Sequence, residues 1–215
     1  MDIFRQIEDA YIWPFVQGIY DSLGWLGVVF LMALESAAIP LPSGVIMPLA
    51  GQRLAGTAGN WWGIFLAGNC GAIGSTLGSL LAYWVGARLI RPLLERQGRG
   101  ALPTRSQLRI IDSWFAKFGP ATVFVARLVP IVRSFISLPA GVSRMDLRKF
   151  AVYTYLGSFL WSAGLAWAGT IWEPREVRET IRPFDLPILL ILLALVVWLL
   201  IHNRGNRDKR SATTA

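Results

Sequence analysis

The sequence predicts an all-α, polytopic membrane protein with about three spanning helices, interfacial amphipathic helices and a pair of inverted re-entrant helical hairpins. Three observations lead to this fold class. Hydrophobic residues make up 54% of the 215 residues and charged residues only 16%, whereas about a quarter of a soluble domain is charged. The apolar residues form long runs that almost lack charge. Some of these runs contain prolines, which interrupt a helix.

The rare residue types limit the chemistry. A single cysteine, Cys70, and a single histidine, His202, exclude an intramolecular disulfide and a Cys/His zinc site. No metal and no cofactor are therefore expected. The net charge of +8 is accounted for by membrane orientation, so nucleic acid is not expected as a partner.

The first segment, residues 1–22, is predicted to be an interfacial helix. Residues 3–21 are partly amphipathic, and Pro14 starts or interrupts the helix. Asp2, Glu8 and Asp9 precede any long apolar run, which is not typical of a secretory signal peptide.

A membrane core over residues 23–185 follows, and it contains two predicted spans, at 61–87 and 150–172. Neither span carries a charged residue, and each has the length that a bilayer requires. A third span is predicted over 186–202, followed by a basic cytoplasmic tail at 203–215.

Two further apolar stretches, 23–51 and 119–141, cannot be ordinary spans. The first contains Pro40, Pro42 and Pro48, and the second contains Pro130 and Pro139. Broken backbone at membrane depth is tolerated only where it is buried in protein or lines a wet cavity. Both stretches are therefore predicted to be re-entrant hairpins.

Basic residues orient the chain. Six arginines between positions 88 and 109 face one acid, and further basic residues occur at 144–149 and 204–210. The positive-inside rule places these segments and the C-terminus in the cytoplasm. Residues 104–118 show helical spacing of apolar residues and are predicted to lie in the cytoplasmic interface.

The two interrupted stretches resemble each other. Residues 39–51 align with 129–141 at a constant offset of 90, which pairs Pro40 with Pro130 and Gly51 with Gly141. Each stretch is followed by a loop and a predicted span. Because one span lies between them, the two units enter from opposite faces, which is the inverted-repeat design of many transporters.

Three charges lie within these apolar stretches: Glu35, Arg127 and Arg133. Each costs roughly 2.5–3.5 kcal/mol at the bilayer centre on insertion scales, so each needs a partner or water. One interpretation is a structural ion pair; the other is an anion site, and the two are compatible. Two arginines against one glutamate leave a positive charge that a phosphate group would neutralise.

Hydroxyl groups and helix-breaking residues complete the predicted site. Ser43 and Ser134 are candidate hydroxyl donors to the anion, or else local backbone caps. The residues predicted to shape the hairpins are Pro40, Pro42, Gly51, Pro130, Pro139 and Gly141. Gly74 and Gly78 have the small-residue spacing of close helix packing, which serves contact with the hairpins and is also compatible with a homodimer.

In combination these motifs resemble the DedA family over residues 20–175. The matching residues are Glu35-x4-Pro40-x-Pro42-Ser43, Pro48-Leu-Ala-Gly51, Gly74-x3-Gly78-x4-Tyr83-x2-Gly86, Phe124-x2-Arg127-x2-Pro130-x2-Arg133 and Pro139-Ala-Gly141. The resemblance implies a multi-pass protein of the bacterial inner membrane that carries undecaprenyl phosphate or phospholipid. It also implies that Glu35, Arg127 and Arg133 are the functional charges. Many members carry a second acid soon after Ser43, where this chain has Gly44.

The leading hypothesis for the function is a lipid-phosphate translocase, working as a flippase or a scramblase, with an anionic lipid as its partner. The alternative is a proton- or ion-coupled transporter of small solutes or ions that maintains the membrane potential, with Glu35 carrying the cation. A membrane enzyme such as a lipid phosphatase is disfavoured, because no histidine lies within the predicted membrane segments up to residue 172.

Overall fold

The computed structural model of the protein describes residues 8–37, 43–92, 119–130 and 132–180. Within these ranges all regular secondary structure is helical, which confirms the all-α prediction for this part of the chain. The predicted interfacial helix at 104–118, the C-terminal span at 186–202, the basic tail, Pro40 and Pro42 lie outside the described residues.

Two helices of 25 residues form the centre of the molecule: α5, Trp61–Val85, and α11, Leu147–Ile171. They correspond to the spans predicted at 61–87 and 150–172. Each begins at a side-chain cap, because the Asn60 side chain accepts a hydrogen bond from the Gly63 N–H at 3.0 Å and Asp146 accepts one from the Lys149 N–H at 2.9 Å. A π-helical turn, η3 (Gly86–Ile90), continues α5.

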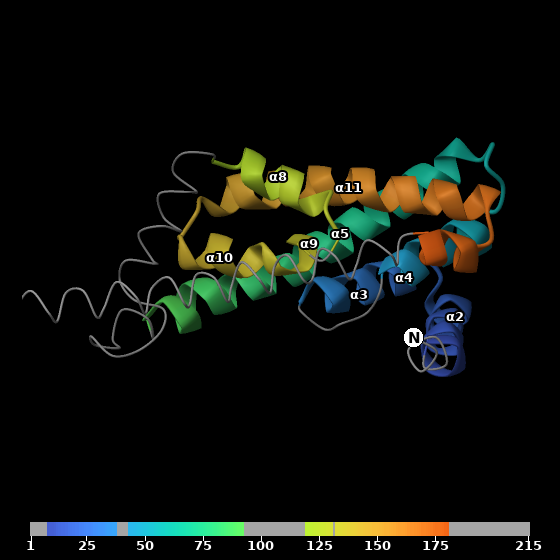
Figure 1. Ribbon diagram of the computed structural model, residues 1–215, viewed down its shortest axis with the longest axis horizontal. Helices are drawn as coiled ribbons and strands as arrows, with labels where there is room; N and C mark the ends of the chain where they lie inside the picture. Colours follow the sequence, from blue (N-terminus) through green and yellow to red (C-terminus); the bar gives the residue numbers. More distant parts are fainter. Residues whose placement is uncertain (1–7, 38–42, 93–118, 131, 181–215) are drawn as a thin grey trace, which may run out of the picture.

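The two long helices are antiparallel and run along the described part of the molecule (Figure 1). The Tyr83 ring lies 5.0 Å from the Phe150 ring near one end, whereas Gly71 faces Ser162 farther along. A Cβ atom at Gly71 would lie 2.5 Å from the Ser162 hydroxyl oxygen, so only glycine permits this approach.

The first broken unit consists of α3, Trp25–Ser36, and α4, Ser43–Ala50, which continues into η2, Gly51–Ala55. Helix α3 lies along α5, where a Cβ at Gly78 would be 2.0 Å from the Ala33 carbonyl oxygen. Helix α4 packs on α11 instead, since a Cβ at Gly169 would be 2.1 Å from the Pro48 carbonyl oxygen.

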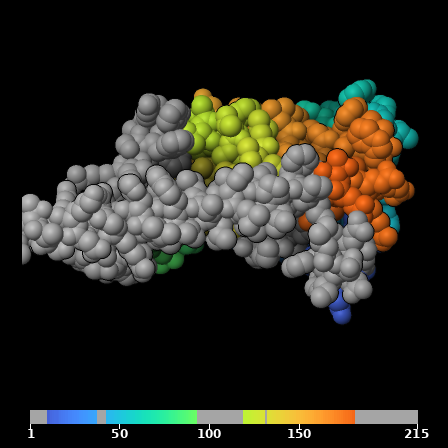
Figure 2. Space-filling model, viewed as in Figure 1, coloured from blue at the N-terminus to red at the C-terminus, as the bar shows by residue number. Residues whose placement is uncertain are grey.

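The second broken unit consists of α8, Ala121–Arg127, α9, Val132–Phe135, and α10, Ser137–Val142. Helix α8 lies along α11, and their surfaces adjoin in Figure 2. Helix α10 crosses to α5, where a Cβ at Gly141 would be 2.1 Å from the Tyr83 carbonyl oxygen. Each unit therefore places its first helix on one long helix and its last helix on the other.

The two units occupy opposite ends of the α5–α11 pair. The α3–α4 unit contacts α11 near Ala166 and Gly169, whereas the α8–α10 unit contacts it near Phe150 and Gly157. The ends of α3 and of α8 consequently approach each other near the middle of the pair, where the buried charges lie.

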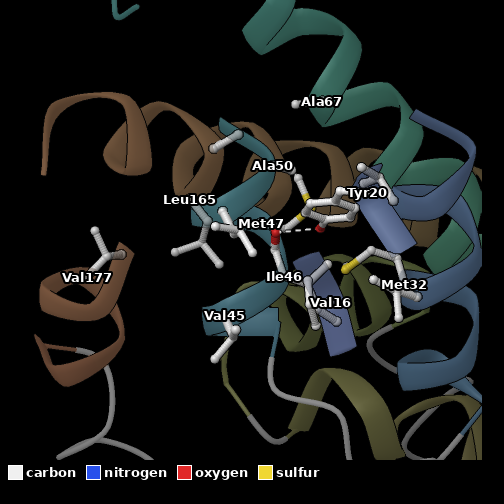
Figure 3. Close-up of a cluster of buried hydrophobic side chains, with 14 of the residues drawn as sticks. Val16, Tyr20, Met32, Val45, Ile46, Met47, Ala50, Ala67, Leu165 and Val177 are labelled. Atoms are coloured by element: carbon white, nitrogen blue, oxygen red, sulfur yellow. Dashed lines mark hydrogen bonds between the residues drawn. The ribbon is translucent and has the colours of Figure 1, made fainter. Parts of the chain in front are cut away.

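The N-terminal helix α2, Trp13–Leu23, follows a π-helical turn, η1 (Glu8–Ile12), and packs on the first broken unit. Pro14 lies in its first turn, where the chain passes from η1 into α2. The Tyr20 hydroxyl donates to the Ile46 carbonyl oxygen at 2.7 Å inside the larger hydrophobic cluster (Figure 3). Gly24, with φ of 53°, makes the turn into α3.

Of the described helices, only the one over Trp61–Ile90, 30 residues long, is apolar enough to cross a membrane by length and composition. Helices α3 (Trp25–Ser36) and α9–α10 (Val132–Val142) are apolar but shorter than a bilayer requires.

Candidate functional site

A buried ion pair joins the two broken units. Glu35, in the last turn of α3, accepts a hydrogen bond from an Nη atom of Arg133 in α9. The two residues are 6% and 4% exposed. The Arg133 guanidinium carbon also lies 5.5 Å from the centre of the Trp161 ring on α11. The sequence places these residues 98 positions apart, and the fold brings them into contact.

Arg127 is the largest fully buried side chain in the described part of the chain, at 1% exposure. It ends α8, and its Nη1 donates to the main-chain carbonyl oxygen of Arg133. Its Nη2 donates to the hydroxyls of Ser79 and Ser137, each at 2.7 Å. Arg127 is thereby connected to α5, to α10 and to the segment that carries Arg133.

The positive charge of Arg127 is not compensated by a carboxylate among the described residues. All its hydrogen-bond partners are neutral, and its Nε atom has no partner. Glu35 is already paired with Arg133. The site therefore combines one structural ion pair with one additional buried cation, as the count of two arginines and one glutamate indicates.

The two predicted serines lie in α4 and α9. Ser43 is buried at the start of α4, and Ser134 is half-buried in α9. Within the described ranges, neither hydroxyl is a hydrogen-bond partner of Glu35, Arg127 or Arg133. Their predicted role as donors to an anion stays a proposal.

Ser79 and Ser137 are the hydroxyls that contact Arg127, and neither was predicted from the sequence as a site residue. A signal for Ser79 was present, since it follows Ser75 by one helical turn in an otherwise apolar, glycine-rich span. Ser137 offers no comparable signal, because its position depends on how α10 turns toward α5.

Gly51 and Gly141, the paired glycines of the repeat, occupy equivalent environments. A Cβ at Gly51 would lie 1.9 Å from the Ala166 carbonyl oxygen on α11, and one at Gly141 would lie 2.1 Å from the Tyr83 carbonyl oxygen on α5. Each glycine thus lets a broken unit approach the opposite long helix. Pro130 lies between α8 and α9, and Pro139 lies within α10.

Gly44, where the sequence departs from the expected pattern, faces the side chain of Arg178. A Cβ at Gly44 would lie 3.1 Å from the Arg178 Cδ. Arg178 belongs to a helical segment at 174–180 that follows α11.

In the described ranges no group of three His, Cys, Asp or Glu residues is arranged to hold a metal ion.

Comparison with known proteins gives one family and several relatives. A family model described as the VTT domain matches residues 27–171. Undecaprenyl phosphate transporter A of Bacillus subtilis (strain 168) is 29% identical over 195 residues, covering 88% of this chain and 93% of the relative. The alkaline phosphatase-like protein of Lactococcus lactis subsp. lactis (strain IL1403) is 32% identical over 196 residues, covering 86% and 90%.

A protein of Staphylococcus aureus (strain NCTC 8325 / PS 47) that carries the name undecaprenyl phosphate transporter A is 26% identical over 196 residues, covering 88% of this chain and 95% of the relative. No solved structure gives a significant match.

Proposed function

The chain belongs to the DedA family of VTT-domain proteins, and on that premise we propose that it is a bacterial membrane transporter that moves a lipid phosphate between leaflets. The phosphate headgroup binds at Arg127 and Arg133, and the hydrocarbon tail stays in the lipid. The observation that carries the proposal is the full burial of Arg127 without a carboxylate partner among the described residues.

The distribution of side chains supports a place in the membrane. On α5 the exposed face carries Ile73, Leu77 and Leu81, whereas the buried face carries glycines and serines. On α11 the exposed face likewise carries Val152, Leu156 and Leu160. Large apolar groups outside and small or polar groups between helices are typical of membrane helices, because lipid solvates the former and close packing uses the latter.

Electrostatics favours an anionic ligand. A guanidinium moved into a low-dielectric interior loses several kcal/mol of hydration, and neutral hydrogen bonds recover only part of that. A phosphate monoester carries a charge of about −1.5 to −2 near neutral pH, and its oxygens match the planar donors of arginine. An arriving phosphate therefore supplies the counter-charge that Arg127 lacks.

The arrangement of the broken units supports transport rather than static binding. The units lie at opposite ends of the α5–α11 pair, and each contacts both long helices. We interpret them as the inverted re-entrant hairpins predicted from the sequence, with the site near the bilayer midplane. Movement of one unit at a time would open the site to one leaflet and then to the other.

The lipid we propose is undecaprenyl phosphate, because relatives from two bacterial species are named undecaprenyl phosphate transporter A and match most of this chain. Phospholipid is the second lipid to test. We place the C-terminus in the cytoplasm, on the basis of the arginine-rich segments, and the protein in the bacterial inner membrane.

The test is transport in proteoliposomes that contain a prenyl phosphate in one leaflet. Arg127→Gln keeps polar donors but removes the charge, and the expected result is loss of at least nine-tenths of the translocation rate. Arg53→Gln is the matched control, because Arg53 is exposed and forms a 3.4 Å surface pair with Asp21. Equal rates for wild type and Arg127→Gln would refute the proposal.

The alternative, a proton- or ion-coupled transporter, is favoured by one observation: the buried carboxylate of Glu35. In that mechanism Glu35 exchanges a cation and the arginines are structural. Glu35→Gln distinguishes the two functions. Ion flux that occurs without any lipid phosphate and disappears in Glu35→Gln would support the alternative.

A further inference from the structure

A row of buried hydroxyl groups lies along the contact between α5 and α11, and one of them, Ser79, accepts a hydrogen bond from Arg127. On α5, Ser75 and Ser79 are one turn apart and are 1% and 0% exposed. On α11, the buried residues Thr154, Ser158 and Ser162 follow one another at the same spacing. We call these five residues the hydroxyl seam.

The two rows face each other because the ends of the seam are fixed by observed contacts. The Tyr83 ring lies against the Phe150 ring at one end, and Gly71 faces Ser162 at the other. Since α5 and α11 are antiparallel and both advance four residues per step on this face, Ser79 lies level with Thr154 and Ser75 lies level with Ser158.

Among the residues that the structure describes, the hydroxyls of Ser75, Thr154 and Ser162 have no hydrogen-bond partner. By contrast, Thr76 on the same helix donates to the Ala72 carbonyl oxygen at 2.7 Å, and Ser22 on α2 donates to the Gly18 carbonyl oxygen at 2.8 Å. Buried polar groups are rarely left without partners, so this cluster needs an explanation.

The Arg127 guanidinium reaches the seam at Ser79, which lies level with the unpartnered hydroxyl of Thr154. The Arg127 Cβ lies against Gly157, and its Nη2 bonds to Ser79, so the Nε between them passes the level of Thr154. That Nε is itself unpartnered. An N–H group that can only donate thus lies beside a row of hydroxyls that can donate, which suits an anion with several acceptor oxygens.

We propose that the hydroxyl seam is the inner half of the headgroup site, and that Ser75 and Thr154 donate hydrogen bonds to a tetrahedral phosphate monoester held by Arg127. This inference rests on the proposed function and adds specificity-determining residues to it. The phosphate oxygens are the acceptors for the Ser75 and Thr154 hydroxyls. Ser162 extends the same row by one layer.

The test is thermal unfolding of the full-length purified protein, followed by tryptophan fluorescence, during titration with a short-chain prenyl monophosphate. Inorganic phosphate and the uncharged prenyl alcohol are titrated in parallel. The variants are Thr154→Val, which replaces a hydroxyl by a methyl of similar shape, and Ser75→Ala. Thr76→Val is the matched control, because its hydroxyl neighbours Ser75 in sequence but bonds within its own helix.

The expected result separates ligand binding from structure. Each seam variant should bind the prenyl monophosphate about tenfold more weakly, because it loses a hydrogen bond to a charged acceptor. Without ligand it should melt at the same temperature as wild type or higher, because an unsatisfied buried group has been removed. Thr76→Val should bind the monophosphate within about twofold of wild type, because it leaves the seam intact.

Three outcomes would overturn the inference. If the seam variants bind like wild type while Arg127→Gln does not bind, the proposed function stands and the role of the seam is wrong. If the variants melt lower without ligand and bind normally, the hydroxyls are structural. Failure of wild type to bind either phosphate overturns both proposals. Equal stabilisation by inorganic phosphate and the monophosphate supports the seam but removes the requirement for a lipid.

Discussion

Adding one methyl group at Gly141 tests how the second broken unit holds the buried arginine. A Cβ there would lie 2.1 Å from the Tyr83 carbonyl oxygen, and real Cβ contacts of this kind are at least 3.0 Å. Gly141→Ala must therefore move α10 away from α5 by about 1 Å. Because Arg127 bridges Ser79 on α5 and Ser137 on α10 at 2.7 Å each, that movement stretches one bond beyond the usual hydrogen-bond limit.

Overpacking of this kind costs about 1–3 kcal/mol, and the lost hydrogen bond to a buried charge costs about 1.5–3 kcal/mol more. For a chain of this size each kcal/mol lowers the melting temperature by roughly 2–4 °C. The expected decrease for Gly141→Ala is thus on the order of 5–20 °C, accompanied by a loss of lipid-phosphate transport.

Gly164→Ala is the matched control, because Gly164 lies inside α11 and a Cβ there would meet nothing within 4 Å. Alanine is the better helix former by about 1 kcal/mol, so this variant should melt slightly higher than wild type. The assay is the melting temperature by tryptophan fluorescence, measured beside transport in proteoliposomes. If both variants melt alike and both transport, the close approach of α10 to α5 is not what positions Arg127.

Three further predictions concern stability. Tyr20→Phe removes the donor to the Ile46 carbonyl oxygen and should cost about 1 kcal/mol by thermal unfolding; no change would show that α2 is not held by this bond. Asn60→Ala removes the side-chain cap of α5 and should lower the free energy of unfolding by about 0.5–2 kcal/mol. Thr170→Ala, at an exposed hydroxyl, is the control, and a comparable loss of stability in it would indicate a nonspecific effect. Glu35→Gln leaves Arg133 buried without its carboxylate and should lower the free energy of unfolding by about 3–5 kcal/mol. If added phosphate restores the melting temperature, this cost is not observed.

Much of the fold could be predicted because it depends on local properties of the sequence. The long helices α5 and α11 follow from uncharged runs of sufficient length, and their observed starts at Trp61 and Leu147 are set by the capping side chains of Asn60 and Asp146. Pro130 predicts the interruption after Arg127, and α8 does end there. These features need no knowledge of tertiary contacts.

The candidate site could be predicted only in part. Charges in apolar sequence are rare enough to single out Glu35, Arg127 and Arg133, and the fold brings all three together. Which arginine pairs with Glu35 and which stays without a carboxylate was not predictable, because it depends on which guanidinium reaches Glu35. Serines are common and weakly informative, so the contacts of Ser79 and Ser137 with Arg127 emerge only from the packing of α5, α8 and α10.

The most direct test of the central claim compares the affinity of the purified protein for a prenyl monophosphate with its affinity for the corresponding prenyl alcohol. The two ligands share a tail and differ only in the charged headgroup. If the buried arginine recognises phosphate, wild type should prefer the monophosphate by at least about 30-fold, and Arg127→Gln should lose that preference. Equal affinity of wild type for the two ligands would contradict the account, since the tail alone would then determine binding.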